Sequence, residues 1–179
     1  LASDDSWMLG RLIVPVSRLD EFEETALAAL RQSAIDETTP WRISALASTA
    51  GTTELQADLV RIAGFNHKHE DDEAGLAVID VVEMKADSVQ EIETAIDQIT
   101  GDLFPFFEIN VSEDPRKLIT AMTDGDCGAK VRTGGTTTDA YPSSADPARF
   151  IHACAPANVP FKATAGMHHP LRRRSEAAG

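Results

Sequence analysis

Residues 128–135, GAKVRTGG, combine an apolar strand pattern with two basic side chains and a pair of glycines. Lys130 and Arg132 are two residues apart, so in a strand they project from the same face. A charged side chain on a sheet face is unfavourable unless it is paired or binds a ligand. Gly134 and Gly135 follow at once, and glycine lets backbone N–H groups approach an oxyanion closely. The stretch therefore predicts a strand that ends in an anion-binding site.

The sequence on both sides of this stretch alternates between strand and helix patterns. Apolar and β-branched residues mark six segments as strands, and apolar residues at helical spacing fill the intervals. Strands that alternate with helices indicate a parallel sheet with right-handed helical connections. The expected strands are residues 10–19, 42–48, 75–86, 103–111, 128–135 and 160–166.

Local signals mark where three of the helices begin. Ser88 and Glu91 form the S-x-x-E pattern of a capping box ahead of an apolar helical face. Asp114 and Asp146 each precede a proline, a residue favoured at the first position of a helix. We therefore expect helices to start at these three places.

The expected end of one helix is Gly64. Apolar residues at helical spacing, from Leu55 to Ile62, precede this glycine, and helices often end at a glycine. The charged segment NHKHEDDE, residues 66–73, follows it. This segment predicts a solvated loop rather than a metal site.

Polar residues near the ends of the expected strands distinguish between two parallel architectures. They recur in pairs at alternate positions, which share one face of a strand. Central strands of an open doubly wound sheet are mostly apolar on both faces. A barrel instead gathers its active-site residues at the carboxyl ends of its strands. The pairs are Glu83 with Lys85, Glu108 with Asn110, Lys130 with Arg132, and Lys162 with Thr164.

These pairs favour a (β/α)8 TIM-like barrel over a complete open sheet of six strands. Such a barrel takes about 250 residues, and the chain has 179. We therefore expect an α/β fold of parallel (β/α) units, of which this chain holds about six. The sequence begins at Leu1 rather than at a methionine. We accordingly expect residues 1–179 to be a single α/β domain that is a fragment of a longer chain.

The composition is that of a soluble globular protein, with 42% hydrophobic and 25% charged residues. The net charge of −13 argues against a nucleic-acid partner, because binding to a phosphate backbone requires positive patches. No apolar run reaches the roughly 18 residues of a membrane span. Cys127 and Cys154 are expected to be reduced packing residues. We expect a cytoplasmic protein without membrane association, and homo-oligomerisation stays open.

Five residues are the candidates for catalysis. Lysine amines form Schiff bases or stabilise enolates, while carboxylates and histidines move protons. An alternative is a structural network in which the carboxylates pair with the lysines. The candidates are Lys130, Lys162, Glu83, Glu108 and His168.

Eight further residues are candidates for binding an anionic substrate. Arginine grips phosphate or carboxylate through two parallel hydrogen bonds, and lysine acts as a point charge. Glycines after a strand offer backbone N–H groups. The candidates are Lys85, Arg132, Thr133, Gly134, Gly135, Thr164, Gly166 and His169.

No cofactor is expected, and the expected partner is a small anionic molecule. Glu83 and Glu108 have the carboxylate oxygens that a divalent metal prefers. However, Lys85, Lys130 and Lys162 are expected at the same strand ends and would oppose a dication. A divalent metal therefore stays an alternative without assigned ligands.

The motifs GAKVRTGG and PFKATAGMHHP (160–170), with WMLGRLIVP (7–15), resemble a family of uncharacterised bacterial proteins. That family carries similar GAK-x-RTGG and PFKATAG-x-HHP motifs. The resemblance covers the whole chain, and it implies a longer protein of the same fold. A looser likeness, at Lys130 and Lys162, is to phosphate-binding and aldolase-type TIM barrels. This likeness implies lysine-based chemistry.

The leading hypothesis is a TIM-barrel-like enzyme that acts on a small anionic carbonyl compound or sugar phosphate. Its chemistry would be that of a lysine-based lyase or aldolase. One alternative is a phosphoribosyltransferase-like enzyme, in which the basic cluster binds pyrophosphate. The other is a non-catalytic ligand-binding or scaffold protein with a structural ion-pair network.

Overall fold

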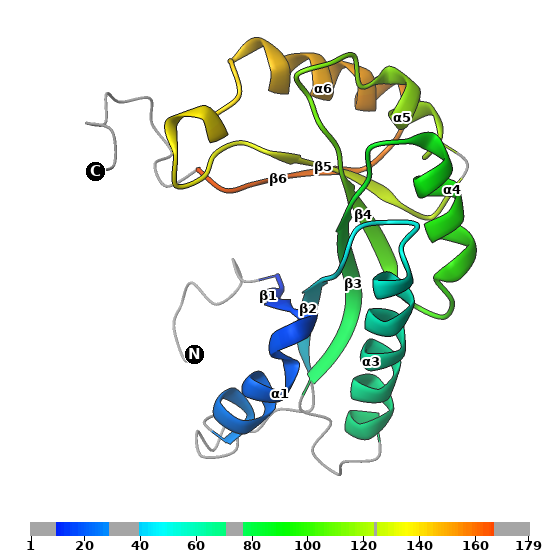
Figure 1. Cartoon of the computed structure of the whole chain (residues 1–179), viewed down its shortest axis with the longest axis vertical. Helices are drawn as coiled ribbons and strands as arrows, with labels where there is room; N and C mark the ends of the chain where they lie inside the picture. The colour runs from blue at the N-terminus through cyan, green and yellow to red at the C-terminus, as the bar shows by residue number, and fades with distance from the viewer. Residues whose placement is uncertain (1–9, 29–39, 71–76, 124, 167–179) are drawn as a thin grey trace. The chain divides into compact units, whose positions relative to one another are not determined.

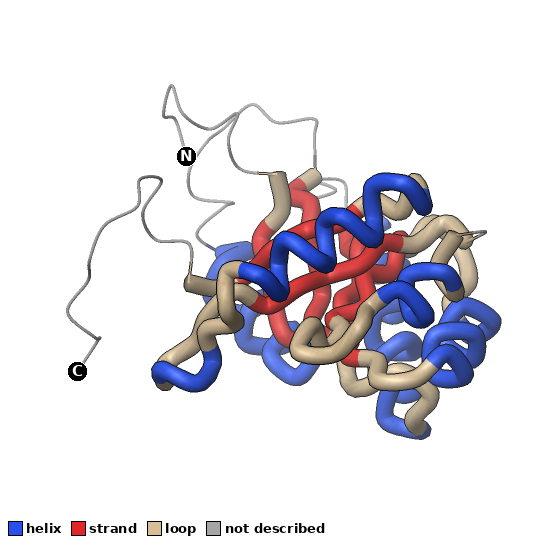
Figure 2. Tube along the Cα trace, turned by 90° about the horizontal axis from the view of Figure 1, so that it is seen from above, coloured by secondary structure: helices blue, strands red, loops and turns tan. Residues whose placement is uncertain are grey.

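The computed structural model of the chain describes residues 10–28, 40–70, 77–123 and 125–166. The chain passes through helical structure between each strand and the next (Figures 1 and 2). The strands are β1 (Leu12–Pro15), β2 (Trp41–Leu46), β3 (Ala77–Lys85), β4 (Phe104–Glu108), β5 (Gly128–Arg132) and β6 (Phe161–Thr164).

The helices of the described residues follow the strands in turn. None of them is both long enough and apolar enough to cross a membrane. They are α1 (Leu19–Phe22), α3 (Thr53–Glu70), α4 (Val89–Gln98), α5 (Arg116–Thr120) and α6 (Ala145–Ala157). Short helical turns occur at Val16–Arg18, Glu23–Leu27 and Thr138–Ala140.

The strands lie in the sheet in the same order as in the sequence, β1-β2-β3-β4-β5-β6. The pairs β1–β2, β2–β3, β4–β5 and β5–β6 are parallel. An open doubly wound sheet reverses its strand order at a switch point, and the described strands contain no such reversal. The predicted α/β fold of consecutive parallel (β/α) units is therefore confirmed.

The chain divides into two compact units. The first comprises Leu1–Met84 and Gln98–Phe104, and the second comprises Lys85–Asp97 and Pro105–Gly179. The first unit holds β1, β2, α3 and nearly all of β3. The second holds most of α4 and β4, together with α5, β5, α6 and β6.

The core of the first unit is built from α3 and the strands β2 and β3. Leu55 and Ile62 of α3 and Ile43 of β2 are fully buried. The register between β2 and β3 shifts beside Ile43, as at a β-bulge. Asn66 of α3 donates a hydrogen bond of 2.7 Å to the Ile79 carbonyl and accepts one of 2.8 Å from its N–H. The Asn66 side chain thus satisfies backbone groups of β3 next to the bulge.

Two sequence predictions about α3 are wrong. The helix does not end at Gly64 but continues to Glu70, so residues 66–70 of the charged segment are helix rather than loop. The buried face extends past Gly64 through Phe65 and His69, which are 6% and 4% exposed. Burial of this longer face outweighs the roughly 1 kcal/mol that a glycine costs inside a helix. Residues 71–73 lie outside the described residues.

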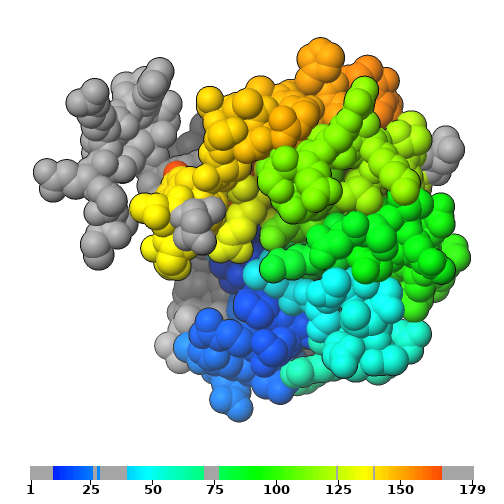
Figure 3. All heavy atoms as spheres, turned by 45° about the horizontal axis from the view of Figure 1, so that its top comes forward, coloured from blue at the N-terminus to red at the C-terminus, as the bar shows by residue number. Residues whose placement is uncertain are grey.

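In the second unit, α5 and α6 pack against each other (Figure 3), and α6 also packs on β5. Phe150 of α6 is fully buried and meets the Phe161 ring edge-on, with the ring centroids 5.7 Å apart. Phe107 of β4 and Ile119 of α5 are buried as well. These contacts attach the helices to the strands that carry most of the candidate site residues.

The helix starts predicted in this unit agree with the structure to within two residues: α5 begins one residue after Pro115, and α6 begins two residues before Pro147. The Ser88 N–H donates to Glu91 at 3.1 Å and the Glu91 N–H donates to the Ser88 hydroxyl at 3.2 Å, which confirms the capping box. Asp114 accepts a hydrogen bond of 3.1 Å from the N–H of Arg116, the first residue of α5. The third helix, α6, begins one residue before Asp146.

Substituting Gly128 tests the packing of the second unit. A Cβ at this position would lie 2.4 Å from the Phe106 ring and 2.9 Å from the Pro160 carbonyl oxygen. We expect Gly128→Ala to lower the free energy of unfolding by about 1–3 kcal/mol, because the core has no room for the methyl group. Urea denaturation measures this change. Gly64→Ala is the matched control: apart from its chain neighbours and the backbone of its own helix, no atom of the described residues lies within 4 Å of its Cβ position, so it should stabilise α3 by up to about 1 kcal/mol. Equal effects of the two substitutions would contradict the packing described.

The two cysteines should be unreactive in the folded protein. Cys127 and Cys154 are buried free thiols, as predicted. Burial raises the pKa of each thiol to about 11, and the charge of Asp126 also raises that of Cys127. Because the thiolate is the reactive form, iodoacetamide at pH 8 should label both slowly in buffer and rapidly in urea. Labelling in buffer at the rate of a free thiol would contradict this burial.

Candidate functional site

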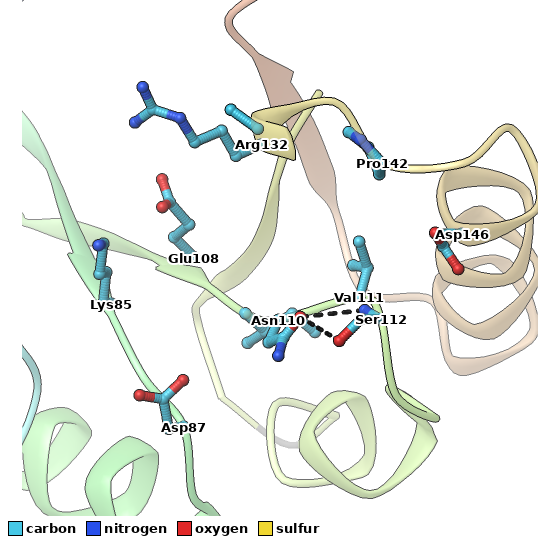
Figure 4. Close-up of a pocket in the computed structure, with 11 residues that line it drawn as sticks. Lys85, Asp87, Glu108, Asn110, Val111, Ser112, Arg132, Pro142 and Asp146 are labelled. Atoms are coloured by element: carbon cyan, nitrogen blue, oxygen red, sulfur yellow. Dashed lines mark hydrogen bonds between the residues drawn. The ribbon is translucent and has the colours of Figure 1, made fainter. Parts of the chain in front are cut away.

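A pocket lies at the carboxyl ends of β3, β4 and β5, within the second unit. It has a volume of about 350 Å³, and all the residues that line it belong to that unit (Figure 4). The carboxyl ends of parallel strands are where barrel enzymes carry their active sites. The lining residues are Lys85, Asp87, Glu108, Ile109, Asn110, Val111, Ser112, Arg132, Ala140, Pro142 and Asp146.

Three candidate residues form one row across β4, β5 and β6. In the parallel register Glu108 lies opposite Lys130, and Lys130 lies opposite Lys162. Lys130 Nζ is 2.8 Å from Glu108 Oε2, and the two side chains are 8% and 13% exposed. The ion pair is therefore largely shielded from water. Removing either partner would leave an unpaired buried charge, which strongly lowers the stability of the fold.

Lys162 lies over an aromatic ring in the same row. Its Nζ is 4.4 Å from the centroid of the Phe106 ring, a cation–π distance. Phe106 lies opposite Gly128 in the register, and the ring occupies the space that a side chain at Gly128 would fill. The glycine of the GAKVRTGG motif thus makes room for the ring that supports Lys162.

Arg132 ends β5, two residues beyond Lys130, and is exposed at the pocket. Its Nε donates a hydrogen bond of 3.0 Å to the Gly134 carbonyl, which orients the guanidinium group. The two terminal nitrogens have no hydrogen-bond partner within the described part of the chain. A guanidinium with two adjacent donors available is suited to bind a carboxylate or phosphate.

Backbone and hydroxyl contacts join the segments that follow β5 and β6. The Thr133 N–H donates to the Thr164 carbonyl at 2.8 Å, and the Thr133 hydroxyl donates to the Ala165 carbonyl at 2.6 Å. A Cβ on Gly134 would lie 2.6 Å from Gly166 Cα. Ala165 and Gly166 have positive φ values of 65° and 72°, which favour glycine. Thr133, Gly134 and Gly166 therefore have structural roles that the sequence did not predict.

Two further predicted residues, Lys85 and Gly135, lie at the pocket or next to its wall. Lys85 ends β3, is exposed and lines the pocket. Gly135 faces Ala140, because a Cβ on Gly135 would lie 2.6 Å from the Ala140 Cβ. This glycine lets the turn at Thr138–Ala140, part of the pocket wall, approach the end of β5.

Glu83 does not line this pocket, and two further predicted residues are not described. Glu83 belongs to the first unit, where it is 1% exposed and accepts a hydrogen bond of 2.5 Å from the Ser44 hydroxyl. His168 and His169 lie outside the described residues. The pocket as described therefore contains Lys85, Glu108 and Arg132, with Lys130 and Lys162 in the adjoining row.

Four polar pocket residues were not predicted as site residues. Asp87 follows β3, Asn110 and Ser112 follow β4, and Asp146 is in the first turn of α6. A signal for the first three was present in the sequence. The alternation that pairs Glu83 with Lys85 continues to Asp87, and the alternation from Glu108 to Asn110 continues to Ser112. The position of Asp146 at the pocket depends on how α6 packs, and no local sequence pattern predicts this packing.

Arg149 of α6 fixes one wall of the pocket. Its Nη2 donates to the Val111 carbonyl at 2.7 Å and to Asp146 at 2.6 Å. Asp146 also accepts hydrogen bonds from the Ser143 hydroxyl and N–H. The Ser143 side-chain hydrogen bond, with a further contribution from Arg149, lowers the pKa of Asp146 below its usual value. The Asp146 carboxylate is thus held ionised and is occupied by groups of the protein itself.

Within the described ranges, no group of three or more His, Cys, Asp or Glu side chains is arranged to hold a metal ion.

Comparison of the chain with family models, with curated proteins and with solved structures gave no match.

Breaking the buried ion pair tests whether the row is as withdrawn from water as described. Glu108→Gln removes a carboxylate that faces the Lys130 ammonium, and we expect the free energy of unfolding to fall by about 3 kcal/mol. Glu21→Gln is the control, since Glu21 pairs with Arg18 on the surface, where both side chains are mostly exposed, and it should change stability little. Thermal and urea denaturation measure both. If Glu108→Gln is as mild as the control, the pair is not buried.

Proposed function

We propose that the protein is an enzyme that binds a small anionic carbonyl compound or sugar phosphate and acts on it through a lysine amine. The observation that supports this most is the row of Glu108, Lys130 and Lys162 on three neighbouring strands. Arg132 lies two residues further along β5, at the pocket. One compact unit thus carries an anion-binding group, two amines and a carboxylate for proton transfer.

Arg132 would hold the anionic group of the substrate, and Lys162 is the preferred nucleophile. Lys130 is buried and engaged by Glu108, whereas Lys162 is only partly buried and lies over the apolar face of Phe106. Lys130, on the neighbouring strand, remains the alternative nucleophile.

The proposed reaction uses only these groups and water. The Lys162 nitrogen attacks the substrate carbonyl carbon, and loss of water leaves an iminium C=N bond. The bond between the α and β carbons then breaks, and its electron pair enters the iminium to form an enamine. Glu108 takes the proton of the β-hydroxyl group as the second fragment leaves as an aldehyde. Protonation of the enamine and hydrolysis release the first fragment and restore the amine.

A non-catalytic ligand-binding or scaffold protein is the second candidate. The ion pair between Glu108 and Lys130 favours it, because a row of paired charges is also what a structural network requires. The hydrogen bonds of Thr133, which join the ends of β5 and β6, favour it as well. On this hypothesis Lys162 forms no covalent adduct.

Reductive trapping distinguishes the two candidates. The full chain is incubated with dihydroxyacetone phosphate or with pyruvate in the presence of borohydride, which reduces an imine to a stable secondary amine. We expect peptide mass spectrometry to locate the adduct on Lys162, and Lys162→Arg to abolish it.

The control for this experiment is Lys117→Arg, which replaces an exposed lysine of α5 and should leave the adduct at Lys162 intact. An adduct confined to Lys130 would exchange the roles of the two lysines. Adducts spread over surface lysines, or none with either probe, would support the scaffold hypothesis.

A further inference from the structure

The pocket carries opposite charges on two of its sides. Figure 4 shows Arg132 and Asp87 on opposite sides of the view, with Lys85, Glu108 and Asn110 between them. A ligand that places its anionic group on Arg132 therefore extends toward an acidic group. A pocket that recognised the anion alone would have no use for this carboxylate, since it repels anions.

A hydrogen bond of its backbone N–H holds Asp87 in place, so its side-chain carboxylate is available to a ligand. The Asp87 N–H donates a hydrogen bond of 2.7 Å to Glu91, a residue of the capping box at the start of α4. Its side chain is exposed, lines the pocket and has no hydrogen bond or ion pair with any residue that the structure describes. An ionised carboxylate only accepts hydrogen bonds. The part of a ligand that lies against Asp87 must therefore donate one.

Asn110 offers a hydrogen-bond donor, which complements the acceptor that Asp87 provides. Its Oδ1 accepts hydrogen bonds from the Ser112 N–H at 3.0 Å and from the Ser112 hydroxyl at 2.9 Å (Figure 4). These two donors fix the orientation of the amide, because only its oxygen can accept them. The amide nitrogen is left as a donor, with no partner elsewhere in the described ranges. A ligand group near Asn110 must therefore accept a hydrogen bond.

From these two requirements we infer that the pocket selects hydroxylated substrates, with Asp87 as the residue that determines this specificity. A hydroxyl group both donates and accepts, so the hydroxyl groups of one ligand can donate to the Asp87 carboxylate and accept from the Asn110 amide. An ammonium group would satisfy Asp87 alone and would lie near the cationic Lys85. The substrate class is then a polyhydroxy compound with a phosphate or carboxylate group, rather than a simple keto acid. This inference rests on the proposed function for the role of Arg132 as the anion-binding group.

Two phosphate monoesters of equal charge test this inference. Glycerol 3-phosphate and propyl phosphate have the same three-carbon chain, and only the first carries hydroxyl groups. We expect calorimetric titration of the full chain to show about tenfold tighter binding of glycerol 3-phosphate, as one or two hydrogen bonds to polar or charged groups provide. Asp87→Ala should reduce this ratio to near one without weakening propyl phosphate. Arg132→Ala should weaken both esters.

Asp97→Ala is the matched control, because it removes one exposed carboxylate of α4 in the same unit that does not line the pocket. It should leave the ratio unchanged. Equal binding of the two esters, or a ratio that survives Asp87→Ala in a folded protein, would overturn the inference. Tighter binding of 3-aminopropyl phosphate than of glycerol 3-phosphate would also overturn it, in favour of an ammonium ligand.

The failure of this inference and that of the proposed function give different results. If the esters are discriminated through Asp87 but no lysine is trapped with either carbonyl probe, only the lysine chemistry fails. If Lys162 is trapped but the esters bind equally, only the hydroxyl specificity fails. If neither ester binds in a way that depends on Arg132, the anion-binding group and the specificity inferred from it are both wrong.

Discussion

The ion pair between Glu108 and Lys130 is the interaction on which the rest of the site depends. Both side chains are nearly withdrawn from water, so neither charge is tolerated there unless the other is held within hydrogen-bonding distance. This requirement selects the register in which β4 and β5 pair, since a shift by one residue would turn one charge to the opposite face. The same register places Phe106 beside Gly128, and the register between β5 and β6 places Lys162 beside Lys130.

Glu108 can form a structural ion pair with Lys130 and still serve the catalytic role proposed for it. A carboxylate held rigidly next to an amine is preorganised, because it needs little reorientation when charge develops during a reaction. The contacts among Thr133, Gly134 and Gly166 also make the site rigid, since they hold the ends of β5 and β6 together. The motif glycines, which suggested a phosphate-binding loop, contribute first of all to this rigidity.

The error at Gly64 shows how far a local signal can be overridden. A glycine after an apolar helical face is a common helix end, but the helix continues when a further turn can be buried. Phe65 and His69 provide that turn, and Asn66 adds two hydrogen bonds to the Ile79 backbone. None of these gains is visible near Gly64 in the sequence, because Ile79 lies on a separate strand.

The sequence by itself determined the alternation of strands and helices and the face on which the polar pairs lie. Both follow from periodicity, which is a property of the local backbone: two residues per repeat in a strand and 3.6 in a helix. Only the tertiary structure decided that Glu108 pairs with Lys130, that Gly134 meets Gly166, and that Asp87 and Asn110 line one pocket with Arg132. These contacts join residues on different strands and loops. They are set by strand register and helix packing, which depend on the whole sheet rather than on neighbours in the sequence.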